Sequence, residues 1–294
     1  MIIVITGPTG VGKTKLSVEI AKKINGEIIN ADSTQIYRGM NIATAKVTEA
    51  EKEGVIHHLI DIKDINEDYT VYNYQIDCRN KISEILKKGK TPIIVGGTGL
   101  YISAALYDYK FEEETYNNTY DEYSDKELYL KLLEVDPETE IHKNNRKRVI
   151  RALNYYENNN KPFSEKEETN RLLYDAIFIG LTTDRQILYD RINQRVDAML
   201  KDGLLEEAKR IYETGIRSKA VLTPIGYKEL FPYFENIEPL ENCIDTMKKS
   251  SRRYAKRQYT WFNNKMDIKW FGVNFENFGK TVNDVYKYVL EKSK

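Results

Sequence analysis

The chain has 294 residues, enough for one large domain or two modest domains with an ample hydrophobic core. No apolar run approaches the roughly 18 residues that a membrane-spanning helix needs, which excludes an integral membrane protein. The 45 basic and 45 acidic residues balance, so overall charge gives no sign of nucleic-acid binding, and any such case depends on local clusters.

The first hundred residues alternate between strand and helix patterns. The N-terminal apolar run is too short for a signal peptide, because Gly7-Pro8 follows it at once, and it fits a buried strand. Strands are expected at 2–6, 27–30 and 93–95, and helices at 13–24, 71–86 and from the Gly-rich turn at 96–99 through 106. This alternation predicts parallel βαβ units.

The composition changes near Tyr109, and the core pattern resumes at Asp175. Helices are expected at 126–135, 138–157, 184–200, 203–212, 227–234 and 240–263, and strands at 175–181 and 268–273, before a terminal helix. We therefore predict an α/β fold of the P-loop NTPase type, a parallel sheet with helices on both faces. Its catalytic core would comprise residues 1–109 and 175–294, and residues 110–174 would form a helical insertion.

The first strand leads into a phosphate-binding loop with the pattern G-x-x-x-x-G-K-[ST], formed by Gly7, Pro8, Thr9, Gly10, Val11, Gly12, Lys13 and Thr14. Backbone N–H groups, the N-terminus of the following helix and the Lys13 ammonium all attract an anion there. The Thr14 hydroxyl is a ligand for Mg²⁺, so Mg²⁺ is the expected cofactor. The loop predicts polyphosphate binding, as in ATP-binding proteins, but leaves the identity of the polyphosphate open.

Asp32 is the candidate acid–base residue. A nucleoside triphosphatase usually completes its magnesium site with an aspartate at the end of an apolar strand, but the strand at 93–95 runs into glycines instead. Asp32 follows the second strand, and the carboxyl ends of neighbouring parallel strands face one crevice. We therefore expect Asp32 opposite the P-loop, although in isolation it could also be a helix cap or turn residue.

Seven ordered segments resemble the tRNA dimethylallyltransferase family. They lie at 31–46 (Ala-Asp-Ser-Thr-Gln-Ile-Tyr-Arg-Gly-Met, then Ile-Ala-Thr-Ala-Lys from 42), 57–61 (His-His-Leu-Ile-Asp), 95–101 (Val-Gly-Gly-Thr-Gly-Leu-Tyr), 145–153, 191–200, 225–229 (Ile-Gly-Tyr-Lys-Glu) and 254–262 (Tyr-Ala-Lys-Arg-Gln-Tyr-Thr-Trp-Phe). The segments follow one another in the family's order, and the resemblance as a whole covers most of the chain.

The resemblance implies a tRNA-modifying prenyltransferase. Such an enzyme moves the dimethylallyl group of dimethylallyl diphosphate to the N6 amine of adenosine-37, next to the anticodon, in tRNAs that read codons beginning with U. The product is N6-isopentenyladenosine. The P-loop would hold the pyrophosphate of the donor instead of ATP. We expect tRNA and dimethylallyl diphosphate as partners, no membrane association, a monomer and a cytoplasmic location.

The resemblance also implies roles for individual residues. Asp32 would be the general base, while Lys13 and Arg195, with Thr9 and Thr14, would bind the pyrophosphate and neutralise its charge. The tRNA-binding residues would be Asp32, Ser33, Thr34, Gln35, Thr98, Lys147, Arg148, Val149, Ile150 and Arg151. These roles agree with the chemistry, since an exocyclic amine is a poor nucleophile and a departing pyrophosphate gains negative charge.

Two local clusters of basic residues could contact phosphates. Residues 143–151 include five basic residues in nine, and residues 248–257 include six in ten. Each could also be an ordinary solvated helix face. Aromatic residues among the second cluster, Tyr254, Tyr259, Trp261 and Phe262, could stack on bases or pack in the core. The start of the insertion is acidic, with Glu112, Glu113 and Glu114, and would repel phosphate.

Other residues with chemical potential have plainer interpretations. His57 and His58 are adjacent and His142 is distant, which favours packing or hydrogen bonding over a metal site. Cys78 and Cys243 are far apart and lack a CxxC context, so neither zinc nor a disulfide framework is expected.

Three alternative functions remain open from the sequence. They are a prenyltransferase for free adenine nucleotides, a small-molecule or nucleoside kinase, and a non-catalytic nucleic-acid-binding module. The first would have no need of the insertion or the basic clusters.

Overall fold

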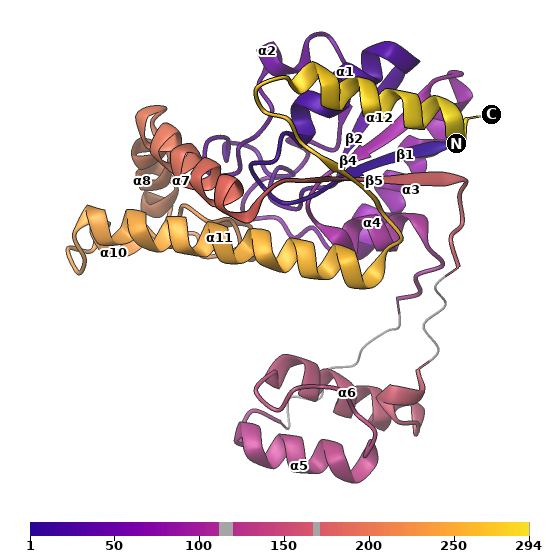
Figure 1. The fold of residues 1–294 in the computed structure, drawn as a ribbon. Helices are drawn as coiled ribbons and strands as arrows, with labels where there is room; N and C mark the ends of the chain where they lie inside the picture. Colours follow the sequence, from indigo (N-terminus) through magenta and orange to yellow (C-terminus); the bar gives the residue numbers. More distant parts are fainter. Residues whose placement is uncertain (112–119, 167–170, 294) are drawn as a thin grey trace. The chain divides into compact units, whose positions relative to one another are not determined.

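The structure, a computed structural model, describes residues 1–111, 120–166 and 171–293. The chain divides into two compact units (Figure 1), one formed by Met1–Tyr107 with Leu172–Lys294 and the other by Asp108–Arg171. The glutamates at 112–114 lie outside the described residues. Among the helices that the structure describes, none combines the length and the apolar character needed to cross a bilayer.

The larger unit is built on a parallel sheet of six strands in the order β3-β2-β4-β1-β5-β6. The strands are β1 (Ile2–Thr6), β2 (Gly26–Asn30), β3 (His57–His58), β4 (Thr91–Val95), β5 (Ala176–Thr182) and β6 (Lys269–Gly272). Every pairing between neighbours is parallel. The predicted parallel α/β sheet is therefore confirmed, and its β3 strand is the one that the sequence analysis did not anticipate.

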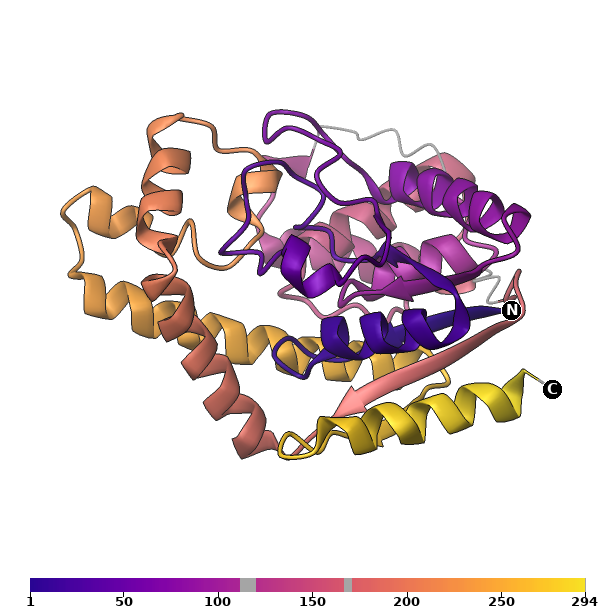
Figure 2. The same ribbon diagram turned by 90° about the horizontal axis from the view of Figure 1, so that it is seen from above.

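Helices cover both faces of this sheet because its strands are apolar on both faces. In β1 the side chains of Ile3 and Ile5 pack on one side and those of Ile2 and Val4 on the other, and each of the four is at most 1% exposed. The first face is covered by α1 (Lys13–Ile24) and α12 (Phe278–Lys292), which both lie above β5 in Figure 1. Seen from above in Figure 2, β5 runs between these two helices. Continuous apolar strands of this kind are typical of parallel sheets.

The opposite face is covered by a second set of helices. They include α3 (Val71–Lys87), α4 (Gly99–Leu106) and α11 (Leu240–Lys265). Beyond the sheet lie α7 (Arg185–Lys201), α8 (Leu204–Glu213), α9 (Lys219–Leu222) and α10 (Phe231–Phe234), and the short α2 (Glu49–Lys52) follows the loop after β2. The expected helix at 227–234 forms only from Phe231, because the preceding residues are turns around Gly226, whose φ is 132°.

The smaller unit contains α5 (Asp125–Val135), α6 (Arg146–Asn159) and the 3-10 turn η2 (Phe163–Glu165). Its core holds Leu128, Leu132, Val149 and Leu153. The expected helix at 138–157 was wrong at its start, since residues 138–145 form turns and irregular backbone. The reason is a cap, because the side chain of Asn145 accepts a hydrogen bond from the N–H of Arg148 and so begins the helix at Arg146.

Candidate active site

The P-loop joins β1 to α1 in a backbone conformation that needs glycine. Gly7 has φ of 138°, and a Cβ added there would lie 2.6 Å from the carbonyl oxygen of Leu181. Gly12 occupies the N-cap of α1 with φ of 99° and offers no side-chain cap, so the first N–H groups of the helix stay available to a ligand. The loop is therefore shaped to receive an anion at the N-terminus of α1.

Lys13 lies at the centre of this loop. Its Nζ donates hydrogen bonds to the carbonyl oxygens of Gly7 at 3.0 Å and Pro8 at 2.8 Å. Burial lowers the pKa of Lys13 to about 8, an effect that Arg195 reinforces and Asp32 opposes. A buried ammonium with a lowered pKa is stabilised by an incoming anion, which makes Lys13 the focus of the anion site.

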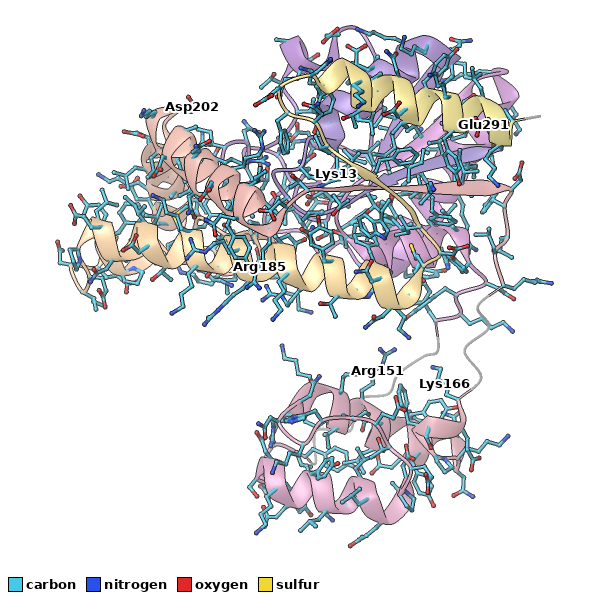
Figure 3. The ribbon with its side chains drawn as sticks, in the orientation of Figure 1. Lys13, Arg151, Lys166, Arg185, Asp202 and Glu291 are labelled. Atoms are coloured by element: carbon cyan, nitrogen blue, oxygen red, sulfur yellow. The ribbon has the colours of Figure 1, made fainter. Side chains whose placement is uncertain are left out.

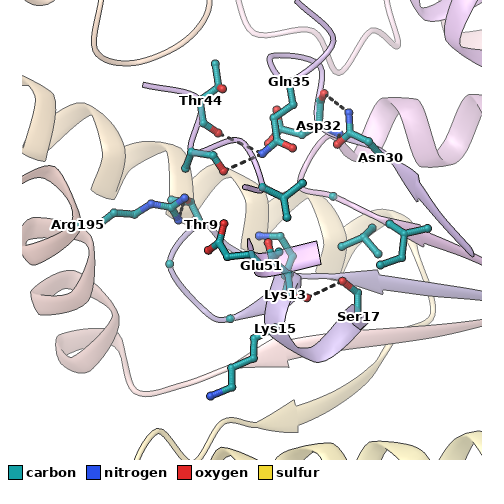
Figure 4. Close-up of a pocket in the computed structure, with 18 of the residues that line it drawn as sticks. Thr9, Lys13, Lys15, Ser17, Asn30, Asp32, Gln35, Thr44, Glu51 and Arg195 are labelled. Atoms are coloured by element: carbon teal, nitrogen blue, oxygen red, sulfur yellow. Dashed lines mark hydrogen bonds between the residues drawn. The ribbon is translucent and has the colours of Figure 1, made fainter. Parts of the chain in front are cut away.

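A cavity of about 510 Å³ opens beside the P-loop. Figure 4 shows Lys13 and Thr9 from the loop, Asp32 from the end of β2 and Arg195 from α7 around it. The cavity is larger than a pyrophosphate group requires, and its walls come from several elements that are distant in the sequence. The structure thus brings Asp32 and Arg195 to one site with five of the expected P-loop residues, which are Thr9, Gly10, Gly12, Lys13 and Thr14. Gly7, Pro8 and Val11 do not line this cavity.

Asp32 is held in place by its neighbours. Its N–H donates to Oδ1 of Asn30 at 3.0 Å, and Nδ2 of Asn30 donates back to the carbonyl oxygen of Asp32 at 3.0 Å. On its side chain, Oδ1 accepts hydrogen bonds from the N–H of Thr34 at 3.0 Å and from its hydroxyl at 2.7 Å. Among the residues described, none donates a hydrogen bond to Oδ2, which leaves that oxygen available to a substrate.

Two arginines of α7 face the P-loop. Nη1 of Arg195 donates to the Thr9 hydroxyl at 3.3 Å, and Nε of Arg191 donates to the carbonyl oxygen of Gly10 at 3.2 Å. The Arg191 guanidinium also lies 3.9 Å from the centre of the Phe275 ring. Burial lowers the pKa of Arg195, while the charges of Asp32 and Glu51 oppose that effect. The sequence analysis missed Arg191, although its spacing of four residues from Arg195 places both on one helix face.

A second cavity of about 380 Å³ adjoins the first. Both are lined by Thr9, Asp32, Thr44, Ala45, Arg195 and Tyr254. The second cavity has an apolar wall that includes Ile192, Met199 and Met247, and it also contacts the basic side chains of Lys228, Arg253 and Arg257. Asp32 therefore lies where a phosphate-binding cavity meets an apolar cavity with basic side chains along it.

The loop after β4 packs against the Asp32 segment. A Cβ on Gly96 would lie 2.1 Å from the carbonyl oxygen of Ala31, so this approach requires glycine. The Thr98 hydroxyl accepts a hydrogen bond from the N–H of Ser33 at 3.1 Å and donates to the Ser33 hydroxyl at 3.3 Å. Thr98 and Ser33, expected to lie at the acceptor side, are thus in direct contact.

The segment at 40–46 contributes Thr44 and Ala45 to the walls of both cavities and is held by hydrogen bonds from Gln35 and Glu207. Nε2 of Gln35 donates to the carbonyl oxygens of Thr44 and Ala45, each at 3.2 Å. The buried carboxylate of Glu207 accepts hydrogen bonds at 2.9–3.1 Å from the N–H groups of Asn41, Ile42 and Ala43. It also accepts one at 2.8 Å from the Tyr227 hydroxyl. Glu207 was not anticipated from the sequence, and no local pattern around it pointed to this role.

The basic residues expected to contact tRNA on α6 belong to the smaller unit. Lys147, Arg148 and Arg151 are exposed, and Figure 3 shows the Arg151 side chain extending from the body of that unit. Val149 is 1% exposed and Ile150 packs partly against the core, so these two residues serve packing. The exposed face of α6 is therefore basic and its inner face apolar.

Of the basic residues in the second cluster, on α11, some contact α7 and others line the second cavity. Lys248 forms an ion pair with Asp197 at 2.6 Å, and Nη1 of Arg252 donates to Oδ1 of Asn193 at 2.6 Å. Both partners are on α7, so these contacts join the two helices. Arg253 and Arg257 instead line the second cavity.

The four aromatic residues of the second cluster also have different surroundings. Phe262 is fully buried, Trp261 packs against Gly99, and the hydroxyl of Tyr259 lies 2.8 Å from the Thr182 hydroxyl. Tyr254 alone among these four lines the two cavities. Burial and the nearby Asp32 charge raise the pKa of Tyr254, which keeps its hydroxyl protonated.

The histidines and cysteines have structural partners or surroundings. Nε2 of His58 lies 2.7 Å from Oε2 of the buried Glu27, and Nδ1 of His57 lies 2.9 Å from the carbonyl oxygen of Val55. Within residues 1–111, 120–166 and 171–293, no three His, Cys, Asp or Glu side chains gather in a way that could hold a metal ion. Cys78 and Cys243 are both buried and unpaired thiols.

The chain is similar to known proteins over nearly its whole length. The family model described as IPP transferase matches residues 35–265. A tRNA dimethylallyltransferase from Bacillus subtilis (strain 168) is 51% identical over 282 residues, covering 92% of this chain and 90% of that protein. A protein of the same name from Anoxybacillus flavithermus is 48% identical over 300 residues, covering 99% of this chain and 96% of that protein.

Two solved structures share the fold. The crystal structure of a full-length tRNA isopentenylpyrophosphate transferase from Bacillus halodurans has a TM-score of 0.77 and 43% identity, and covers 99% of this chain and 96% of that one. A eukaryotic dimethylallyltransferase, described as acting on tRNA, has a TM-score of 0.80 and 34% identity, and covers 92% of this chain and 73% of that one.

Proposed function

Because the chain belongs to the IPP transferase family, we propose that it transfers a dimethylallyl group from dimethylallyl diphosphate to the N6 amine of adenosine-37 in tRNAs that read codons beginning with U. The observation that carries the proposal is the position of Asp32, at the junction of the P-loop cavity and the second, basic cavity. A donor diphosphate fits the first cavity and an extruded adenine fits the second.

Asp32 acts as the general base of the reaction. The N6 nitrogen attacks C1 of the dimethylallyl group, the N6–C1 bond forms, and the bond between C1 and the diphosphate oxygen breaks. Pyrophosphate leaves with the bonding electrons, and the proton of the amine passes to Asp32. Oδ2 is suited to accept it, because Oδ1 is already occupied by the two hydrogen bonds from Thr34.

Cationic and backbone groups of the P-loop cavity stabilise the departing pyrophosphate. Lys13 and Arg195 are both half-buried in the cavity, where their charges are screened less than in water, and Arg191 lies on the same face of α7. The N–H groups at the start of α1 add their partial charges. These groups act where negative charge develops during the reaction, so they lower its barrier.

Mg²⁺ fits the same cavity through Thr14. The Thr14 hydroxyl lines the cavity and has no hydrogen-bond partner within the described part of the chain. Hard cations take oxygen ligands, and a bound diphosphate provides those that the protein lacks. When bound, the metal ion would neutralise charge on the diphosphate oxygens. Thr14 would hold it while Lys13 contacts the remaining oxygens.

The acceptor side favours tRNA over a free nucleotide. A base within a folded RNA must leave its stack to reach Asp32, and the second cavity provides a partly apolar space lined by Arg253 and Arg257. The exposed stripe of Lys147, Arg148 and Arg151 provides further phosphate contacts. Because residues of a single chain line both cavities, we propose that the enzyme works as a monomer. Because its proposed acceptor is tRNA, we propose that it works in the cytoplasm.

The proposal is tested by offering a labelled donor to different acceptors. The protein is incubated with radiolabelled dimethylallyl diphosphate and Mg²⁺, together with unmodified tRNA, AMP or no acceptor, and in parallel with γ-labelled ATP. We expect label on the tRNA, at the adenosine beside the anticodon, and none on AMP. Transfer to AMP alone would support the free-nucleotide alternative, and phosphoryl transfer from ATP would replace the proposal with a kinase.

A further inference from the structure

Gln258 of α11 connects two loops of the site through its side-chain amide. Its Oε1 accepts a hydrogen bond from the N–H of Thr9 in the P-loop at 2.9 Å. Its Nε2 donates one to the carbonyl oxygen of Gly97, in the loop after β4, at 3.1 Å. The residue is only 5% exposed and lines the P-loop cavity. The oxygen and the nitrogen of one buried amide thus join the P-loop to the loop after β4.

The space around Gly97 is limited by this amide alone. A Cβ added to Gly97 would lie 2.0 Å from Nε2 of Gln258, and the next two nearest atoms, at 3.2 and 3.9 Å, also belong to Gln258. The φ angle of Gly97 is outside the range that disfavours other residues. A methyl group at Gly97 would therefore displace the end of the Gln258 side chain, and the backbone conformation of Gly97 itself does not exclude such a group.

The connection continues from Gly97 to the Asp32 segment. Thr98 follows Gly97 directly in the chain, and both Thr98 and Gln258 act to lower the pKa of Tyr254, which lies one helical turn before Gln258. Thr98 in turn accepts the hydrogen bond from the N–H of Ser33, the residue next to Asp32. A continuous series of contacts thus runs from Thr9 on the donor side, through Gln258, to the residue beside the base.

We propose that Gln258 is a positioning residue that holds the P-loop and the Asp32 segment at the separation that the transfer reaction needs. This inference rests on the proposed prenyl transfer. It concerns alignment, because C1 of the donor and N6 of the acceptor must meet at bonding distance, and a misplacement of about 1 Å can cost on the order of 10²-fold in rate. Loss of Gln258 should therefore lower kcat more than it lowers the affinity for either substrate.

The central experiment is a double-mutant cycle between Gln258 and Gly97. Gln258→Ala removes the amide, and Gly97→Ala displaces it with a single methyl group. We expect each variant to lower the single-turnover rate at saturating tRNA and dimethylallyl diphosphate by on the order of 10–100-fold. In the double variant the added methyl meets no amide, so its rate should equal that of Gln258→Ala instead of showing a second loss.

Binding and folding are measured on the same proteins. Kd values for tRNA and, separately, for inorganic pyrophosphate with Mg²⁺ should stay within about 3-fold of wild type, with Tm changed little in Gly97→Ala. Gln186→Ala, which removes an exposed glutamine of α7 outside both cavities, is the matched control and should keep wild-type rates. Amide hydrogen exchange should become faster in the peptide that contains Thr9 in both Gln258→Ala and Gly97→Ala.

Two results would overturn the positioning role. One is a wild-type single-turnover rate in Gly97→Ala with unchanged exchange at Thr9, and the other is additive losses in the double variant. A rate loss explained wholly by weaker pyrophosphate binding would reassign Gln258 to donor binding. Failure of the proposed function is distinguishable, since in that case the wild-type protein itself would transfer no dimethylallyl group to tRNA, while the exchange measurement would still report whether Gln258 holds the P-loop.

Discussion

Thr34 donates two hydrogen bonds to the same oxygen of Asp32, one from its N–H at 3.0 Å and one from its hydroxyl at 2.7 Å. Both go to Oδ1, so they fix the rotation of the carboxylate and direct Oδ2 to the substrate side. These two hydrogen bonds form a local turn, which an Asp followed two residues later by a Thr forms readily.

The first prediction concerns this pair. Asp32→Asn should keep the fold and donor binding but lower single-turnover transfer to tRNA by roughly 10²–10⁴-fold, the usual contribution of a general base. Thr34→Val keeps the backbone bond and removes the hydroxyl, so a smaller loss of about 10-fold is expected. An Asp32→Asn protein with a near wild-type rate would leave Asp32 as a turn residue.

The second prediction concerns Lys13 and pH. Because burial lowers the pKa of Lys13 to about 8, its ammonium is largely deprotonated above that pH in the free protein. Binding a diphosphate restores the charge, so a proton must be taken up, and Kd for dimethylallyl diphosphate should rise by up to tenfold per pH unit above about pH 8. Titration calorimetry between pH 7 and 9.5 measures this dependence.

A permanently charged side chain provides the control for the Lys13 prediction. Lys13→Arg should lose the pH dependence even where its affinity differs from wild type, because a guanidinium stays protonated over this range. Arg195→Ala should weaken diphosphate binding and retain the dependence. A wild-type Kd that stays flat from pH 7 to 9.5 would mean that Lys13 does not titrate in the site.

The third prediction concerns the exposed stripe of the smaller unit. Replacing Lys147, Arg148 and Arg151 together with Ala should weaken tRNA binding and reduce the slope of log K against log salt by about 2–3, since each phosphate contact contributes about 0.7–0.9. Dimethylallyl diphosphate binding should not change. A matched variant with Ala at Lys209, Lys280 and Lys287, exposed lysines of the larger unit, should bind tRNA as wild type does. Identical slopes in the two triple variants would identify the stripe as an ordinary solvated face.

The fourth prediction concerns Glu207, whose carboxylate accepts hydrogen bonds from three backbone N–H groups and the Tyr227 hydroxyl. Glu207→Ala leaves these donors without their acceptor and should lower the free energy of unfolding by about 2–4 kcal/mol. Tyr227→Phe removes one of the four donors and should lower it by about 1 kcal/mol. Urea unfolding followed by circular dichroism gives both values, and equal losses would show that the backbone contacts contribute little.

Elements with strong local patterns could be predicted from the sequence, and those defined by distant contacts could not. The strand Ile2–Thr6 and the helix Lys13–Ile24 were predicted with the observed bounds, because an apolar run ends in the P-loop and a periodic segment follows it. The strand His57–His58 has two half-buried polar residues and pairs only with β2 among the described strands, so nothing in its composition indicated a strand. The start of α6 depended on a cap at Asn145 within a segment of generally helical character.

The residues of the site also differ in how far they could be predicted from local sequence. The P-loop and Asp32 could be located from motifs, since their chemistry is encoded in adjacent residues. Glu207 and Gln258 could not, because their partners lie 166 and 249 residues away in the chain. Glu207 lies in an amphipathic helix and Gln258 lies among basic residues, and neither sequence context indicates a structural role. Their functions arise only where the fold places a backbone N–H in front of them.

The two connections of the insertion lie side by side at the edge of the larger unit. Tyr107 and Leu172 form a bridge, and the N–H of Leu173 donates to the carbonyl oxygen of Leu106 at 2.9 Å. Within the smaller unit the N–H of Asp108 likewise donates to the carbonyl oxygen of Arg171 at 2.9 Å. The chain therefore leaves the larger unit after Tyr107 and returns to it at Leu172, at the same place.

This arrangement bears on the order of folding. As an unfolded loop, residues 108–171 would oppose the pairing of β5 with β1 by a length-dependent closure entropy on the order of 4 kcal/mol. If the smaller unit folds first, its ends are already together and much of that entropy has been lost before the sheet forms. In that case the slow step of assembly would be the pairing of the parallel strands on either side of the insertion.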